Sequence, residues 1–379
     1  MSDPTDDAHP AGRPAGHRPD TRLRVAVLGA GSIGCHLGGL LASVADVTLI
    51  GRPAAMDELR THGLTLTGGG RATLTVPADR LHLATAPDAV EGADLVLVTV
   101  KSAATAEAAA SVADRLGPRT AVVSFQNGLH NPAAIRAAVG DRPVIAGMVP
   151  YNVLQTGPGV FHQGSGGTLM TDDQPAGAPL AAAARAAGLA LEQRADMREV
   201  QHGKLLMNLN NAVNALSGLP LREELGHRAY RRCLALCQRE ALAAMRADGV
   251  RPARLGALPT ALLPRLLALP DGVFRRLAAA TLRVDAEARS STWEDLRRGR
   301  RTEIDSLQGE VVAMAARHGL AAPANARLIE LVRAAEAAGP ERLPALGGAE
   351  LLAELTAATA AHRRRGLSDD PRRARGVAR

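Results

Sequence analysis

Three polar residues recur at helical spacing in the second half of the chain. Lys204 is followed by Asn208 and Asn211, within helical periodicity that we expect to run from 197 to 217. At about 100° per residue, Asn208 lies about 40° from the direction of Lys204, and Asn211 about 20° to the other side. Such a stripe could give a proton and hydrogen bonds to a bound ligand. We expect it to face a substrate; a polar seam between two helices is the alternative.

Lysine is scarce in this chain. Lys101 and Lys204 are the only lysines among 45 basic residues, so arginine fills almost every ordinary basic role. Lysine can lower its pKa and release a proton, whereas arginine effectively cannot. The two lysines therefore indicate positions that need an ammonium group.

A second polar stretch spans residues 290–305 and contains Ser291 and Glu303. Ser291 stands three residues before Glu294, which is the spacing of a capping box, so this serine could be a helix N-cap. Glu303 lies among arginines, where a solvated ion pair is the simpler interpretation.

A glycine-rich motif follows an uninterrupted apolar run at 24–28, which we expect to be a buried strand. Its residues are Gly29, Ala30, Gly31, Ser32, Ile33 and Gly34, and a small-residue helix is expected after them. The glycines allow a tight turn, close approach of a pyrophosphate, and close helix–strand packing. The free N–H groups at the helix start favour phosphate. The motif predicts dinucleotide binding, with a plain structural turn as the alternative.

Arg52 follows the next predicted strand, 47–50. NAD-binding units usually carry an acidic residue there, which accepts hydrogen bonds from the ribose hydroxyls. An arginine suits a 2′-phosphate instead. We therefore expect the cofactor to be NADP(H), although an ordinary surface arginine is the alternative.

Lys101 and Asn127 each follow a predicted buried strand, 94–100 and 120–124. In open α/β sheets the ligand crevice lies at the carboxyl ends of the strands. We expect Lys101 to face cofactor or substrate. Asn127 precedes Gly128, so it either forms a simple turn or reaches into the crevice.

The sequence predicts an α/β fold in which an N-terminal Rossmann-type dinucleotide-binding domain precedes an all-helical C-terminal domain. Helical periodicity dominates from about residue 197, so we place the boundary near 194. The expected parts are a disordered tail (1–21), the NADP-binding domain (22–194), the helical substrate domain (195–362) and a basic disordered tail (363–379). Within the first domain, 157–162 and 167–170 should extend the sheet in antiparallel fashion, and 189–191 should form its last edge strand.

Composition narrows the function class. The net charge is +7, but residues 363–379 hold seven arginines against two aspartates, so the rest is nearly balanced and no nucleic-acid partner is expected. Three cysteines without histidines at ligand spacing predict neither disulfides nor a metal site, and they suit the cytoplasm. The N-terminus has no apolar segment, so we expect no signal peptide or membrane anchor.

These motifs together resemble the ketopantoate reductase family (2-dehydropantoate 2-reductases), which belongs to the fold group with a 6-phosphogluconate-dehydrogenase-like C-terminal domain. The resemblance covers roughly residues 23–335. It rests on the glycine motif, Arg52, Val100-Lys101, Gln126-Asn127-Gly128, Lys204 with Asn208, and Ser291 followed by Arg301-Thr302-Glu303-Ile304-Asp305. The last two motifs are fairly specific.

The resemblance implies NADPH-dependent reduction of 2-dehydropantoate to (R)-pantoate, a step of pantothenate and coenzyme A biosynthesis. Lys204 would be the general acid, and Asn208, Ser291 and Glu303 would bind substrate. Asn127 would lie between nicotinamide and substrate, while Arg52 and Lys101 would lie near the NADPH phosphates. Glu303 could hold the ammonium or accept a substrate hydroxyl, and so counts with the catalytic and cofactor-facing residues.

One position departs from the family pattern. The family carries a second asparagine eight residues after the lysine, where this chain has Ala212, and Asn211 is expected to substitute for it. A related reductase of another 2-keto acid therefore stays open, as does a protein that holds NADP(H) without turnover. A homodimer is also left open.

Overall fold

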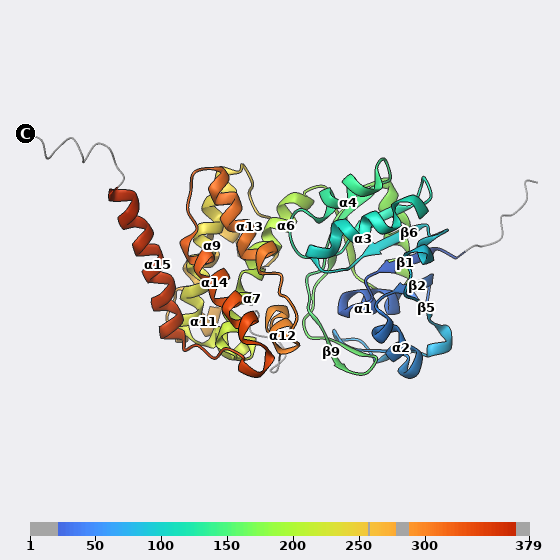
Figure 1. Ribbon diagram of the computed structural model, residues 1–379, viewed down its shortest axis with the longest axis horizontal. Helices are drawn as coiled ribbons and strands as arrows, with labels where there is room; N and C mark the ends of the chain where they lie inside the picture. Colours follow the sequence, from blue (N-terminus) through green and yellow to red (C-terminus); the bar gives the residue numbers. More distant parts are fainter. Residues whose placement is uncertain (1–21, 257, 278–287, 369–379) are drawn as a thin grey trace, which may run out of the picture.

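The computed structural model describes residues 22–256, 258–277 and 288–368. The chain forms two lobes side by side, one with a central sheet and one built of helices (Figure 1). The expected N-terminal tail, 1–21, lies outside the described residues. The predicted α/β class, a Rossmann-type domain followed by a helical domain, is confirmed. None of the helices in the described part is long and apolar enough to cross a membrane.

An eight-stranded sheet, in the order β12-β11-β8-β7-β6-β1-β2-β5, forms the centre of the first lobe. All neighbouring pairs are parallel except β11 and β8, so β11 and β12 run opposite to the other six strands. The strands are β1 (Arg24–Leu28), β2 (Asp46–Ile50), β5 (His82–Ala84), β6 (Leu95–Val98), β7 (Ala121–Ser124), β8 (Val144–Met148), β11 (Leu169–Asp172) and β12 (Leu191–Arg194).

Both faces of this sheet are covered, which explains the uninterrupted apolar runs. Val25 and Val27 of β1 pack into the core on the α1 side, whereas Ala26 and Leu28 pack into the core formed with α3 and α4. The helices of this lobe are α1 (Ser32–Leu41), α2 (Pro53–His62), α3 (Thr105–Val112), α4 (Asn131–Val139) and α5 (Ala178–Ala186).

A second, four-stranded sheet packs against α1. Its strands, in the order β4-β3-β10-β9, are β3 (Leu64–Gly68), β4 (Leu74–Val76), β9 (Val153–Gly157) and β10 (Val160–Gln163). The expectation that 157–162 extends the main sheet is wrong, because β10 pairs with β3 and β9 instead. The expectation for 167–170 is confirmed by the antiparallel pairing of β11 with β8.

The edge strand predicted at 189–191 begins only at Leu191. Leu189 instead closes the end of α5, where its N–H bonds to the carbonyl of Ala184 after Gly188 turns with a φ of +63°. Such a left-handed glycine closure is a common helix ending.

The second lobe contains only helices within the described residues. They are α6 (Met197–Asn208), α7 (Asn210–Ser217), α8 (Leu221–Gly226), α9 (Arg228–Ala247), α10 (Leu263–Leu267), α11 (Asp271–Leu277), α12 (Ser291–Arg297), α13 (Ile304–Arg317), α14 (Pro323–Ala338) and α15 (Gly348–Ser368). Helix α9 packs against α7, α13, α14 and α15 around one apolar core. Helix α15 continues six residues past the expected end at 362, so the start of the predicted basic tail is helical. Residues 369–379 lie outside the described part.

The helix expected over 197–217 is broken at Leu209 into α6 and α7. The side-chain amide of Gln308 donates to the carbonyl of Leu209 at 2.9 Å, and that of Gln238 to the carbonyl of Leu206 at 3.1 Å. Side chains that bond to helix carbonyls compete with the backbone ladder. The polar stripe that begins at Lys204 therefore crosses this interruption.

Candidate functional site

The glycine-rich turn connects β1 to α1 and divides its tasks among three glycines. Gly29 has a φ of +111°, and a Cβ there would stand 2.6 Å from the backbone nitrogen of Val100. A Cβ on Gly34 would overlap the carbonyl oxygen of Gly29. A Cβ on Gly31, in contrast, would meet no atom within 4 Å. Packing thus requires the outer glycines, and open space before Gly31 leaves room for a pyrophosphate.

The start of α1 is suited to an anion. Gly31 is its N-cap, and no side chain caps the first N–H groups of the helix. Gly31 is exposed, and Ser32 and Ile33 are half-buried. Free N–H groups and the positive end of the helix dipole favour phosphate oxygens. The residues present at this turn therefore fit a dinucleotide.

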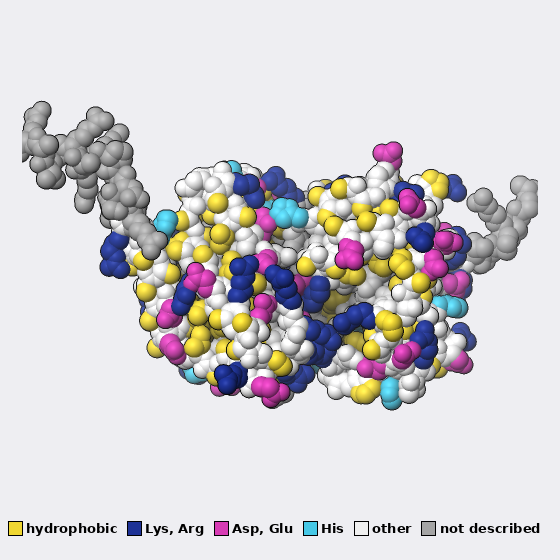
Figure 2. Space-filling model, viewed as in Figure 1, with side chains coloured by type: hydrophobic (Ala, Val, Ile, Leu, Met, Phe, Trp, Pro, Cys, Tyr) yellow, Lys and Arg dark blue, Asp and Glu magenta, His cyan; other side chains and the backbone are white. Residues whose placement is uncertain are grey.

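Arginines from both lobes lie near this region. Arg52 is exposed and is the N-cap of α2, directly after β2. The pKa of Arg300 in the helical lobe is lowered, first by burial and then by repulsion from Arg298 and Arg52. Arg298 also donates to the carbonyl of Gln155 in β9 at 3.1 Å. Figure 2 shows Lys and Arg side chains gathered along the boundary between the lobes, an arrangement that suits a phosphorylated ligand.

A chain of amide hydrogen bonds crosses from one lobe to the other. Asn208 Nδ2 donates to Asn127 Oδ1 at 3.0 Å, and Asn127 Nδ2 donates to Glu303 Oε2 at 3.0 Å. Gly128, with a φ of +93°, forms the turn after Asn127. The two interpretations of Asn127 are thus compatible, because the backbone turns while the amide side chain reaches across the boundary.

Ser102 and Asn131 support this chain from the α/β side. The Ser102 hydroxyl donates to the carbonyl of Asn127 at 2.6 Å, and its backbone N–H lies 3.4 Å from Glu303 Oε1. Asn131 Nδ2 also donates to the carbonyl of Asn127 at 2.6 Å and is held in turn by Thr105 at 2.8 Å. The Asn127 backbone is therefore fixed, which fixes the position of its amide.

Lys101 pairs with a carboxylate that sequence reasoning missed. Its Nζ lies 2.7 Å from Asp295 Oδ2 and 3.9 Å from Glu303 Oε2. Asp295 is only 5% exposed, and its pKa is raised by burial, against the attraction of Lys101. The ammonium at the end of β6 therefore faces two carboxylates from the helical lobe.

Lys204 is partly buried in α6, one turn before Asn208. Its Nζ donates to the carbonyl of Pro150 at 3.3 Å, so the loop after β8 orients it. Desolvation lowers the pKa of the Lys204 ammonium to about 8. Such an ammonium gives up its proton more readily than a solvated lysine does.

Ser290, and not Ser291, caps α12. The Oγ of Ser290 accepts from the backbone N–H of Trp293 at 3.2 Å, so the capping-box interpretation of Ser291 is wrong by one residue. The hydroxyl of Ser291, the first residue of the helix, accepts from Asn211 Nδ2 at 3.3 Å. This pair presents a hydroxyl and an amide at the same place.

The asparagines of α6 and α7 divide into two groups. Asn208 and Asn211 take part in the contacts between polar site residues described above. Asn214 instead accepts from the N–H of Ser290 at 2.9 Å and is fully buried, and Asn210 donates to Glu224 at 2.9 Å. Burial raises the pKa of Glu224 to about 8, although hydrogen bonds from Asn210 and Asn214 act to lower it. Asn210 and Asn214 thus form part of a polar seam between helices, whereas the expectation that the stripe from Lys204 faces a substrate stays a prediction.

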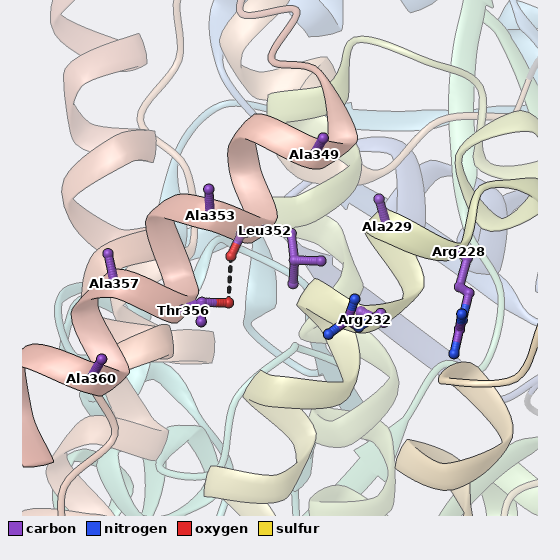
Figure 3. A pocket seen from close by; sticks show the side chains of 9 residues that line it. All are labelled: Arg228, Ala229, Arg232, Ala349, Leu352, Ala353, Thr356, Ala357 and Ala360. Carbon is purple, nitrogen blue, oxygen red and sulfur yellow. Dashed lines mark hydrogen bonds between the residues drawn. The ribbon is translucent and has the colours of Figure 1, made fainter.

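A cavity lies elsewhere in the helical lobe. A groove of about 670 Å³ runs between α9 and α15, lined by Ala229 and Arg232 on one side and by Leu352, Ala353 and Thr356 on the other (Figure 3). None of the predicted site residues lines it. The chemistry-bearing side chains at the lobe boundary are therefore the better candidate site.

Comparison with known proteins identifies the family. Residues 25–173 match the model of ketopantoate reductase PanE/ApbA, and residues 196–336 match that of its C-terminal part. A 2-dehydropantoate 2-reductase of Halobacterium salinarum is 32% identical over 330 residues, covering 84% of this chain and 100% of that relative. A second one, from Pyrococcus horikoshii, is 28% identical over 329 residues, covering 84% and 99%.

A solved structure agrees with these matches. The PanE/ApbA family ketopantoate reductase from Ralstonia eutropha superposes with a TM-score of 0.72 at 32% identity, covering 83% of this chain and 99% of that chain. Family models thus match both lobes, and the matches with these relatives cover nearly the whole length of each relative. The chain belongs to the ketopantoate reductase family.

Proposed function

We propose that this protein reduces 2-dehydropantoate to (R)-pantoate with NADPH, as a step of pantothenate and coenzyme A biosynthesis. The observation that carries the proposal is the chain Asn208–Asn127–Glu303 across the lobe boundary, with Lys204 one helical turn from its first member. A proton donor and a set of oriented hydrogen-bonding groups thus lie at the boundary between the two lobes. Family membership supports the same activity.

The residues that would hold NADPH come mainly from the α/β lobe. Gly29, Ala30, Gly31, Ser32, Ile33 and Gly34 would surround the pyrophosphate, and Arg52 would contact the 2′-phosphate. Lys101 would lie near the phosphates, and Asn127 and Glu303 would lie nearer to the nicotinamide half. When bound, this cofactor supplies the hydride for the substrate ketone.

The chain's own residues would handle charge and protons. Lys204 would donate a proton to the oxygen of the ketone as negative charge develops there. Ser291 and Asn211 would hydrogen-bond the substrate carboxylate, and Asn208 would help to orient the ketone. Glu303 already accepts from Asn127 and could also accept a substrate hydroxyl.

The departure at position 212 bears on the choice of 2-keto acid. Ala212 is fully buried in the helical core, whereas Asn211 faces Ser291. An asparagine one residue earlier than in the family pattern thus contacts the proposed substrate-binding serine. This contact supports 2-dehydropantoate, and another 2-keto acid is the second candidate.

We also place the enzyme in the cytoplasm, since its three cysteines are free and buried, as in a reducing compartment. A homodimer is the oligomeric state to test by light scattering. No nucleic acid or membrane enters the proposed function.

The test is NADPH oxidation by the purified protein with 2-dehydropantoate, pyruvate or 2-ketoisovalerate in parallel. Rapid oxidation with 2-dehydropantoate alone supports the proposal. Turnover with another keto acid moves the substrate assignment within the same chemistry. Tight NADPH binding without turnover on any of them would contradict catalysis and indicate a sensor.

A further inference from the structure

Asp295 is a buried carboxylate outside the set of residues assigned above. It lies in α12, one turn after Ser291, and is 5% exposed. Its carboxylate pairs with Lys101 of the other lobe, an ammonium that is itself half exposed. Burying a carboxylate is costly unless its charge is compensated. This pairing therefore holds Lys101 in one position.

The position of Lys101 matters because of a shared oxygen. Lys101 Nζ stands 3.9 Å from Glu303 Oε2, while Asn127 Nδ2 donates to that same oxygen at 3.0 Å. An ammonium is a stronger donor to a carboxylate than a neutral amide is. If Lys101 came within hydrogen-bond distance, the ammonium and the Asn127 amide would share Glu303 Oε2, and the stronger contact with the ammonium would draw the carboxylate away from the amide.

The competition would be passed on to the helical lobe. Asn127 Oδ1 accepts from Asn208 at 3.0 Å. A rotation of the Asn127 amide would therefore also disturb the hydrogen bond that orients Asn208. Asp295 Oδ2 lies 2.7 Å from Lys101 Nζ and so holds the ammonium away from Glu303. Because Lys101 pairs with Asp295, Glu303 stays available to Asn127, and the hydrogen-bond chain Asn208–Asn127–Glu303 is kept.

We propose that Asp295 is a positioning residue that holds the Lys101 ammonium away from Glu303 Oε2, so that this oxygen remains the acceptor of the Asn127 amide. The kinetic consequence rests on the proposed function, but the contact itself does not. With Asp295→Asn, Lys101 moves to Glu303 and Asn127 loses its acceptor. We expect kcat to fall by roughly 10- to 100-fold at saturating NADPH, as for a misplaced reacting group.

A crystal structure of the D295N protein tests the contact directly. We expect Lys101 Nζ within about 3 Å of Glu303 Oε2, and the hydrogen bond from Asn127 to that oxygen broken. A structure that keeps the Asn127–Glu303 bond and sends Lys101 elsewhere overturns the inference. Asp295→Ser serves if the Asn variant does not fold. This readout needs no turnover, so it stays informative even if 2-dehydropantoate is not the substrate.

Kinetics separate positioning from simple bonding between the lobes. If Asp295 only ties the lobes together, Lys101→Met removes the same tie, and K101M/D295N is as slow as D295N. If Asp295 restrains Lys101, removing the ammonium frees Glu303, and the double variant has a higher kcat than D295N. A double variant no faster than D295N contradicts the inference.

A second ion pair between the lobes provides the matched control. His130 Nε2 lies 2.6 Å from Glu310 Oε2, outside the amide chain. His130→Ala should leave kcat within about threefold of wild type, since the His130 side chain is exposed and Arg317 remains beside the buried carboxylate of Glu310. A large loss in this control would show that any weakened lobe contact slows the enzyme, and would count against a specific role of Asp295.

Discussion

The amide of Asn208 donates to Asn127 Oδ1 at 3.0 Å, and this bond joins the first helix of one lobe to the loop after β7 of the other. Because Asn127 also donates to Glu303, both ends of its carboxamide are committed. The groups proposed to meet the substrate are thus oriented only when the two lobes lie against each other. Preorganised donors of this kind contribute most where charge develops in a reaction.

Ser290 and Ser291 are adjacent serines with separate expected roles. Ser291→Ala should raise the KM for the keto acid by roughly 10- to 100-fold, because a hydrogen bond to a charged group contributes about 1.5–3 kcal/mol. Its effect on the unfolding free energy should be small. Ser290→Ala should lower that free energy by about 0.5–2 kcal/mol, since it removes the cap of α12. Steady-state kinetics and denaturant unfolding of both variants check this. Equal effects on KM would contradict the division.

Arg52 should determine the choice between NADPH and NADH. Arg52→Ala should raise the KM for NADPH by roughly 10- to 100-fold and leave the KM for NADH nearly unchanged, because only NADPH carries the 2′-phosphate. Arg60→Ala in the same helix is the control, since Arg60 pairs with Asp57 at 2.6 Å on the surface. An equal loss for both cofactors would rule out contact with the 2′-phosphate.

The pH dependence of the rate should follow Lys204. The proposed acid acts in its protonated form, and desolvation lowers its pKa to about 8. Therefore kcat/KM should be level below that pH and fall about tenfold per unit above it, as the ammonium loses its proton. Rates measured from pH 6 to pH 10 test this. A kcat/KM that stays level to pH 10 would exclude a Lys204 ammonium with a pKa of about 8 as the proton donor.

The parts of the molecule that depend on local sequence could be predicted. The strand, glycine turn and helix at 24–41 follow from an apolar run and three glycines, and the φ of +111° at Gly29 and the closeness of its carbonyl to Gly34 explain two of these glycines. The stripe from Lys204 follows from helical periodicity alone. Residue type and spacing carry this information without reference to the rest of the chain.

The parts of the molecule that depend on distant partners could not be predicted from the sequence. The interruption at Leu209 lies where the amides of Gln238 and Gln308, on other helices, bond to helix carbonyls. Nothing in the local sequence distinguishes Asp295 from the neighbouring acidic residues, and only the fold brings it to Lys101, 194 residues earlier. The cap of α12 is Ser290 and not Ser291. A capping pattern in the sequence does not locate the start of a helix to the exact residue.

The most direct test of the central claim compares wild type with Lys204→Ala and Lys204→Arg on 2-dehydropantoate, with NADPH binding titrated by fluorescence in the same samples. We predict NADPH dissociation constants within about threefold of wild type, and turnover lower by roughly 100-fold or more in both variants, because arginine keeps the charge but does not release the proton. Turnover of the Lys204→Ala protein comparable to wild type, with NADPH bound, would contradict Lys204 as the general acid.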